Sequence, residues 1–132
     1  MTERPILATI ESVRTGTLET ATVTLAYRDQ TNSGSATTSV GAQIGETLKM
    51  VAEAAARAIE AGLEGRWTLE VRAVALGQVG DEPVCLVQVA DIEAGDLLFG
   101  IAGVGGDDVE KAMARAVLDA TNRRMLPKLD SD

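Results

Sequence analysis

A chain of 132 residues with 45% hydrophobic residues can bury one core, so we expect a single domain over residues 1–132. Its formal net charge of −8 excludes nucleic acid as an expected partner, because that binding depends on Lys and Arg neutralising phosphates. No apolar run approaches membrane-spanning length, and the first residues lack the basic and apolar parts of a signal peptide. This predicts a cytoplasmic protein without a membrane partner.

Three strands are predicted in the first part of the chain. The clearest covers residues 18–28, where apolar residues alternate with threonines at the two-residue period of a half-buried strand. A strand at residues 6–14 precedes it. After a loop at residues 29–34, which is rich in Asp, Asn, Ser and Gly, residues 35–40 are expected to return antiparallel.

An amphipathic helix is predicted over residues 41–61. Its apolar residues recur at spacings of three and four, which places them on one stripe, and charged residues occupy the other face. Gly62 and Gly65 supply the left-handed residue on which helices commonly end. The apolar stripe comprises Ile44, Leu48, Val51, Ala55 and Ile59.

The second half repeats this order. Strands are predicted at residues 67–76, 83–92 and 97–102, and the middle one is nearly all apolar, which is typical of a central strand. Asp107 or Asp108 can cap a second helix, which we expect to end at Pro127. Its buried stripe comprises Val109, Met113, Ala116, Val117 and Ala120.

The repeat has an offset of 64 to 65 residues. Val23 superposes on Val87 at the shorter offset, and Ile44 superposes on Val109 at the longer one. So long an offset indicates two fused copies of one supersecondary unit. We predict an α+β fold of two βββα units, about residues 5–63 and 66–126, with antiparallel sheets, helices packed on one side and pseudo-twofold symmetry. A looser interpretation is that any sheet-then-helix sequence matches itself to some degree.

The residue types argue against catalysis. The chain has no His, which removes the usual general base and the common catalytic triads. Its one cysteine, Cys85, has apolar neighbours and is expected to be a buried, inert thiol. We predict no enzyme and no catalytic residue. A carboxylate-dependent enzyme would instead need a deep cleft holding a buried carboxylate with a raised pKa.

No cofactor and no metal are predicted. The glycine cluster between residues 100 and 106 suggests a dinucleotide-binding turn, but Asp108 stands where the third glycine would fall, and no P-loop lysine follows. Asp107, Asp108 and Glu110 could form a metal site. Carboxylates this close in sequence more often serve as a helix cap and first-turn charge.

The two helix starts are the candidate ligand site. Amides at a helix start can accept a carboxylate while a nearby Asp neutralises an ammonium, which suits a zwitterion. Two such starts that face a shared crevice between the units would form one site. The candidate ligand-binding residues are Gly41, Ala42, Ile44, Gly105, Gly106, Asp107 and Asp108. In the alternative interpretation the glycines only turn the chain and the aspartates only cap the helix.

The segment at residues 103–123 carries a resemblance to a known family. It consists of a Gly-rich turn, an Asp-led helix with Ala112, Ala116 and Ala120 at four-residue steps, and the pair Asn122-Arg123. In these features it resembles the end of the C-terminal regulatory domain of the 2-isopropylmalate and citramalate synthases. That domain is also a tandem of two strand-strand-strand-helix units.

This resemblance implies a non-catalytic regulatory domain that forms a homodimer and binds an effector, leucine or isoleucine, between its units. We expect the ligand to be such a small apolar amino acid or a related acid. The synthases carry the domain behind a catalytic barrel with a histidine-containing metal site. We therefore expect a free-standing relative or an excised domain that works with a separate catalytic chain. A structural protein that forms an obligate oligomer without a small-molecule ligand is the alternative from another class.

Overall fold

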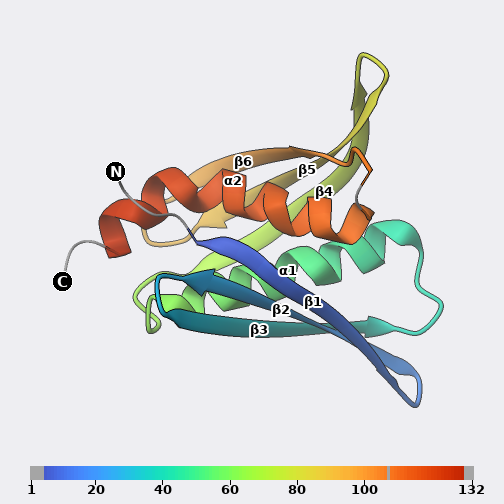
Figure 1. Ribbon diagram of the computed structural model, residues 1–132, viewed down its shortest axis with the longest axis horizontal. Coiled ribbons are helices and arrows are strands. Elements are labelled where there is room, and N and C mark those ends of the chain that lie inside the picture. The colour runs from blue at the N-terminus through green and yellow to red at the C-terminus, as the bar shows by residue number, and fades with distance from the viewer. Residues whose placement is uncertain (1–4, 107, 130–132) are drawn as a thin grey trace.

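The fold consists of two three-stranded antiparallel sheets, each followed by a helix (Figure 1). The computed structural model describes residues 5–106 and 108–129. In chain order the elements are β1 (Ile6–Thr15), β2 (Leu18–Tyr27), β3 (Gln30–Ser39), α1 (Ile44–Gly62), β4 (Leu69–Val79), β5 (Glu82–Asp91), β6 (Asp96–Gly103) and α2 (Val109–Leu129). This arrangement confirms the predicted tandem of βββα units and the α+β class.

The two helices form a middle layer with one sheet on each outer side (Figure 1). Helix α1 packs on β2 and β3, and α2 packs on β5 and β6. The units also interlock, since β4 reaches α1, β1 reaches α2, and the helices contact each other. Each sheet therefore buries one face against the helices and leaves its other face outside.

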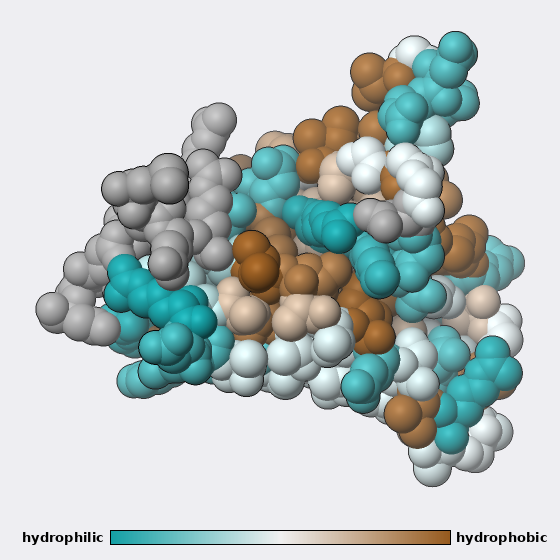
Figure 2. Space-filling view, viewed as in Figure 1, coloured by the Kyte–Doolittle hydropathy of each residue, from teal (hydrophilic) through white to brown (hydrophobic). Residues whose placement is uncertain are grey.

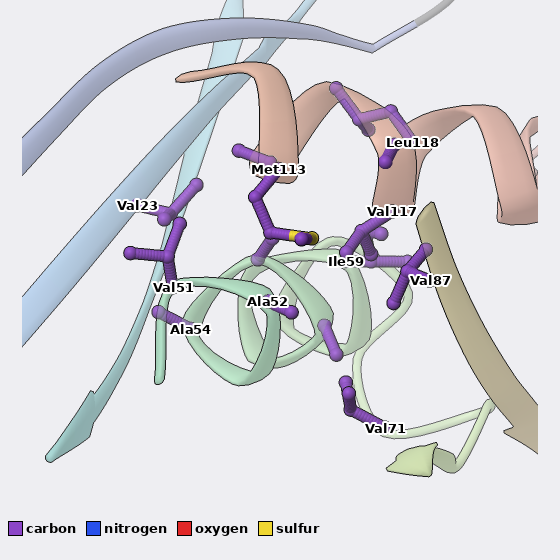
Figure 3. Packing of buried hydrophobic residues seen from close by; sticks show 14 of the residues in the cluster. Val23, Val51, Ala52, Ala54, Ile59, Val71, Val87, Met113, Val117 and Leu118 are labelled. Atoms are coloured by element: carbon purple, nitrogen blue, oxygen red, sulfur yellow. The ribbon is translucent and has the colours of Figure 1, made fainter. Parts of the chain in front are cut away.

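Small side chains fill the space between the layers. Figure 3 shows Met113 and Val117 of α2 pointing toward α1, where Ile59 meets them. Around these larger residues both helices are lined with alanines, which allow strands and helices to approach closely from several directions. The buried alanines of the helices are Ala52, Ala54, Ala55, Ala56, Ala58, Ala112, Ala114, Ala116 and Ala120.

The closest approach occurs where a glycine in the third strand of each unit touches the helix main chain. A Cβ atom added at Gly34 in β3 would overlap the backbone of α1 at Ala54 and Ala58. One added at Gly100 in β6 would overlap the backbone of α2 at Ala116 and Ala120. Any side chain at either glycine would therefore have to push a helix away from its sheet.

The first two strands of each sheet superpose at the predicted offset of 64 residues. The third strands superpose at an offset of 66, since Gly34 pairs with Val23 and Gly100 pairs with Val87. The turn between β1 and β2 contains Gly16 with φ 61°, and the equivalent turn between β4 and β5 contains Gly80 with φ 62°. Register shifts occur between Leu7 and Thr9 in β1 and at the matching place, residues 71–73, in β4. The duplication thus extends to the irregularities of the strands.

The helices correspond at an offset of 62 residues, so the predicted superposition of Ile44 on Val109 is wrong by three residues. Every buried residue at positions 50–59 has a buried residue 62 positions later, at positions 112–121. The glycine contacts of Ala54 and Ala116 obey the same offset. A helical stripe repeats every three to four residues, so periodicity leaves such a shift undetermined.

Three local predictions are also corrected. The predicted loop at residues 29–34 is shorter, because β3 begins at Gln30. Ile44 was expected in the buried stripe of α1 but is 55% exposed, since it starts the helix beyond the end of the sheet contact. Helix α2 continues past Pro127 to Leu129. A proline removes the bond to the carbonyl four residues earlier and crowds that carbonyl, but the residues after it keep their own amide hydrogens, so a last turn can follow it.

Replacing Gly100 by Ala should lower the free energy of unfolding by about 3 kcal/mol, because the new methyl group overlaps the α2 main chain. Urea unfolding followed by fluorescence of the buried Trp67 measures this change. Gly103→Ala is the matched control in the same strand, since nothing lies within 4 Å of its added Cβ. Gly103→Ala should lower the free energy of unfolding by less than about 0.5 kcal/mol. Equal losses in the two variants would contradict the close-contact account.

Candidate functional site

The predicted ligand site at the helix starts is an open surface. Both helices begin at the same end of the molecule, as expected for a shared site (Figure 1). However, five of the six described candidate residues are exposed and the sixth, Ala42, is half-buried. The exposed ones are Gly41, Ile44, Gly105, Gly106 and Asp108. The remaining candidate, Asp107, lies outside the described residues.

Asp108 serves as the cap of α2. Its Oδ1 accepts a hydrogen bond from the backbone amide of Lys111 at 2.8 Å, which confirms the capping prediction. Burial, followed by the nearby carboxylates of Asp108 and Glu19, raises the pKa of Glu110 in the first turn. These acidic neighbours oppose the binding of a ligand carboxylate at this helix start.

A cavity of about 390 Å³ lies at the other end of α1, where this helix passes the end of the first sheet. Its floor is apolar and buried, and is formed by Leu25 of β2 with Ala58, Ile59 and Leu63 from the end of α1. The size falls within the range of small-molecule sites. The sequence interpretation missed this site because Gly62, expected to end the helix in a left-handed conformation, is helical and opens the space instead.

Polar groups stand at the inner wall and the rim of this cavity. The hydroxyl of Tyr27 is buried without a hydrogen-bond partner, and the Asn32 side chain lies against Gly62. The guanidinium of Arg28 sits 4.9 Å from the centre of the Tyr27 ring, close enough for a cation–π contact. Buried hydroxyls almost always find a partner, so the Tyr27 hydroxyl is an unusual feature of this wall.

The second unit holds an ion cluster at the matching place. Arg124, 62 positions after Gly62, donates to Asp91 Oδ2 at 3.0 Å and to Asp96 Oδ2 at 2.6 Å. Burial opposes the ionisation of Asp91, but hydrogen bonds from the Ala94 amide, Trp67 and Arg124 hold the pKa of its carboxyl below the usual value. A charged side chain therefore fills the space that stays open in the first unit.

The outer face of the second sheet is apolar. Pairing places Ala75, Leu86 and Ile101 in one row across β4, β5 and β6, and Gln88 and Phe99 in the next. Phe99 is 68% exposed, and Leu97, Ile101 and Leu86 are also exposed. In Figure 2 brown atoms gather along the margin formed by this sheet. We call the residues Leu86, Leu97, Phe99 and Ile101 the outer apolar patch.

The outer face of the first sheet is hydroxyl-rich at the equivalent positions. Thr22 and Ser35 pair across β2 and β3 with their hydroxyl oxygens 2.8 Å apart, and Thr24 and Ser33 do the same. Pale atoms line the corresponding margin in Figure 2. The inner faces of the two sheets are thus alike, whereas their outer faces carry different kinds of side chain.

Other chemical features of the described residues are few. Cys85 is buried, its thiol donates to the carbonyl of Val109 at 3.6 Å, and burial raises its pKa, as expected for an inert thiol. Within residues 5–106 and 108–129, no group of three or more Cys, Asp or Glu side chains could hold a metal ion. None of the described helices has the length and apolarity needed to cross a bilayer.

Comparison with known proteins gave no match to a family model, to a curated protein or to a solved structure.

Asp91→Asn should destabilise the protein by about 1–3 kcal/mol at pH 7, because the carboxylate of a buried, hydrogen-bonded pair is lost. The folded-state pKa of Asp91 is lowered, so its contribution is present above the unfolded pKa and disappears as the pH falls through the folded value. Urea unfolding at a series of pH values should show the difference from wild type shrinking on acidification. Asp96→Asn, at a half-exposed partner of the same arginine, should cost less. A pH-independent difference for Asp91→Asn would contradict this account.

Proposed function

We propose that this chain is a non-catalytic module that assembles as a homodimer through the outer face of β4–β6. The outer apolar patch is the observation that supports the proposal, because solvent-exposed Phe, Leu and Ile side chains gather on one sheet face. At the corresponding positions the first sheet carries threonines and serines. The two sheets have the same fold but different outer faces. The fold itself therefore does not require apolar residues on the outer face of β4–β6.

The extent of this face suits an interface. Three strands about 4.8 Å apart and eight residues long give a face of roughly 14 Å by 26 Å. This is the size of the largest apolar patch on a typical monomer, roughly 300–600 Å², and such patches often bind a partner. Gln88 is the polar side chain within the two central rows of this face, so little desolvation opposes association.

A second copy of the chain is the partner whose shape fits this face. Bulky residues stand on β6, whereas β4 carries Ala73 and Ala75 at the same face. A twofold axis parallel to the strands would place Phe99 of one protomer over these alanines of its partner. Such packing has the geometry of a sandwich of two sheets about 10 Å apart.

The regulatory part of the proposal draws on the resemblance to the end-product-sensing domain of the 2-isopropylmalate and citramalate synthases. In this form the dimer is cytoplasmic, serves a separate catalytic chain, and binds leucine or isoleucine at the helix starts. The exposure of Gly41, Gly106 and Asp108 favours the alternative, an oligomeric structural protein without a ligand at that place. Both the regulatory and the structural form of the proposal include the homodimer.

Phe99→Glu should weaken the dimer about 100-fold or more, since it places a charge at the centre of an apolar interface. Sedimentation equilibrium over a range of protein concentrations measures the dissociation constant. Thr22→Glu is the matched control on the outer face of the other sheet and should leave the dimer intact. A wild-type chain that stays monomeric, or a dimer sensitive to Thr22→Glu alone, would overturn the proposal.

Titration calorimetry with leucine and isoleucine separates the regulatory form from the structural one. Regulation at the helix starts requires saturable heat that disappears when Asp107 and Asp108 are both replaced by Ala. The exposed positions of the described candidate residues lead us to expect no saturable heat from either amino acid. Saturable, Asp-dependent binding would establish the sensing form instead.

A further inference from the structure

We propose that the cavity at the C-terminal end of α1 is a binding site for a small organic anion, a monocarboxylate with an apolar body. This site lies away from the helix starts and from the outer apolar patch. It therefore does not depend on dimer formation or on an effector at the helix starts.

The sequence keeps this space open in one unit and fills it in the other. Gly62 and Arg124 hold equivalent positions in α1 and α2, and the Arg124 side chain reaches across its unit to Asp91 and Asp96. Gly62 has no side chain. Its backbone is helical, and a Cβ atom added there would lie 3.2 Å from Asn32 Nδ2, so a side chain fits if Asn32 shifts by a few tenths of an ångström. The cavity thus results from a specific residue choice in a fold that elsewhere closes the same gap.

The charged groups at this place differ between the two units. Strand pairing shows that Tyr27 and Gln30 of the first unit stand where Asp91 and Asp96 stand in the second. The residue that follows the strand is Arg28 in the first unit. Its counterpart 64 positions later is an isoleucine. Two carboxylates that hold a guanidinium are therefore replaced by two neutral groups next to Arg28, which removes negative charge from the inner wall of this space.

The groups that line the cavity suit a ligand with an apolar body and one carboxylate. Leu25, Ile59 and Leu63 form a buried apolar floor that suits a hydrocarbon body. The Tyr27 hydroxyl is enclosed beside the cavity and has no hydrogen-bond partner, so a turn of this side chain toward the cavity would let it donate to a carboxylate oxygen. Such charge-assisted bonds are stronger than neutral ones. The Arg28 guanidinium lies over the Tyr27 ring, 4.9 Å from its centre, and Arg28 also lines the cavity.

The rim sets the total charge of the site. Asp29 and Glu64 stand there together with Arg28 and Arg66, so the rim is neutral overall. A monoanion can therefore enter without facing a net negative field, unlike at the start of α2, where Glu110 lies close to two other carboxylates. A dianion would gain no further partner at the inner wall, which favours a single carboxylate.

Hexanoate is the probe for the test, with hexanamide as its neutral counterpart of nearly the same shape. Amide resonances recorded by two-dimensional NMR during each titration should show saturable shifts at residues 27–32 and 58–66 with hexanoate. The expected dissociation constant is on the order of 1 mM or lower for so small a ligand. Hexanamide should bind at least about tenfold more weakly, since it lacks the charge.

Two variants locate the binding. Gly62→Arg copies the second unit and should abolish the hexanoate shifts by filling the cavity. Tyr27→Phe should weaken hexanoate binding about tenfold through loss of the hydroxyl, and it decides the question if the arginine variant does not fold. The proposal is overturned if hexanoate gives no saturable shifts, if hexanamide binds equally well, or if Tyr27→Phe binds like wild type. Phe99→Glu should leave hexanoate binding unchanged, so failure of this site and failure of the dimer are distinguishable.

Discussion

The contact between strand and helix main chains at Gly34 and Gly100 sets the spacing on which the other features of this protein depend. With no side chain between them, each helix sits as close to its sheet as backbone atoms allow. This leaves room mainly for alanine around the helices, which explains a core with few large side chains. Each helix is then enclosed by its own sheet, the neighbouring helix and a strand of the other unit. As a consequence the outer sheet faces and the ends of the helices are the surfaces that can acquire a function.

The duplicated units keep this internal geometry and differ at those surfaces. One outer face became hydroxyl-rich, with paired Thr and Ser side chains, and the other became apolar around Phe99. At the ends of the helices, one unit closes its gap with Arg124 and two carboxylates, while the other leaves it open beside Gly62. Because the backbone is nearly the same in both units, each difference can be attributed to the residues concerned. The internal repeat thus serves as a control within one molecule.

Much of the fold can be predicted from the sequence, because strand alternation and helical stripes are local signals that burial enforces. The strand offset between Val23 and Val87 is fixed by such alternation, since a shift of one residue would turn every side chain to the other face. The helix offset is not fixed, because a stripe nearly repeats after three or four residues. The cavity could not be predicted either. It requires knowing that Gly62 lies against Asn32 and lines the same cavity as Tyr27, and glycine at a helix end is ordinarily a cap.

The central claim is that the apolar outer face of β4–β6 joins two copies of the chain. Isotope-filtered NOE spectroscopy on a mixture of labelled and unlabelled protein tests it most directly, because it detects only contacts between protomers. The account predicts NOEs from the Phe99 ring of one protomer to the Ala73 and Ala75 methyl groups of its partner. Intermolecular NOEs confined to Thr and Ser side chains of β2 and β3, or none at concentrations where the protein is dimeric, would contradict it.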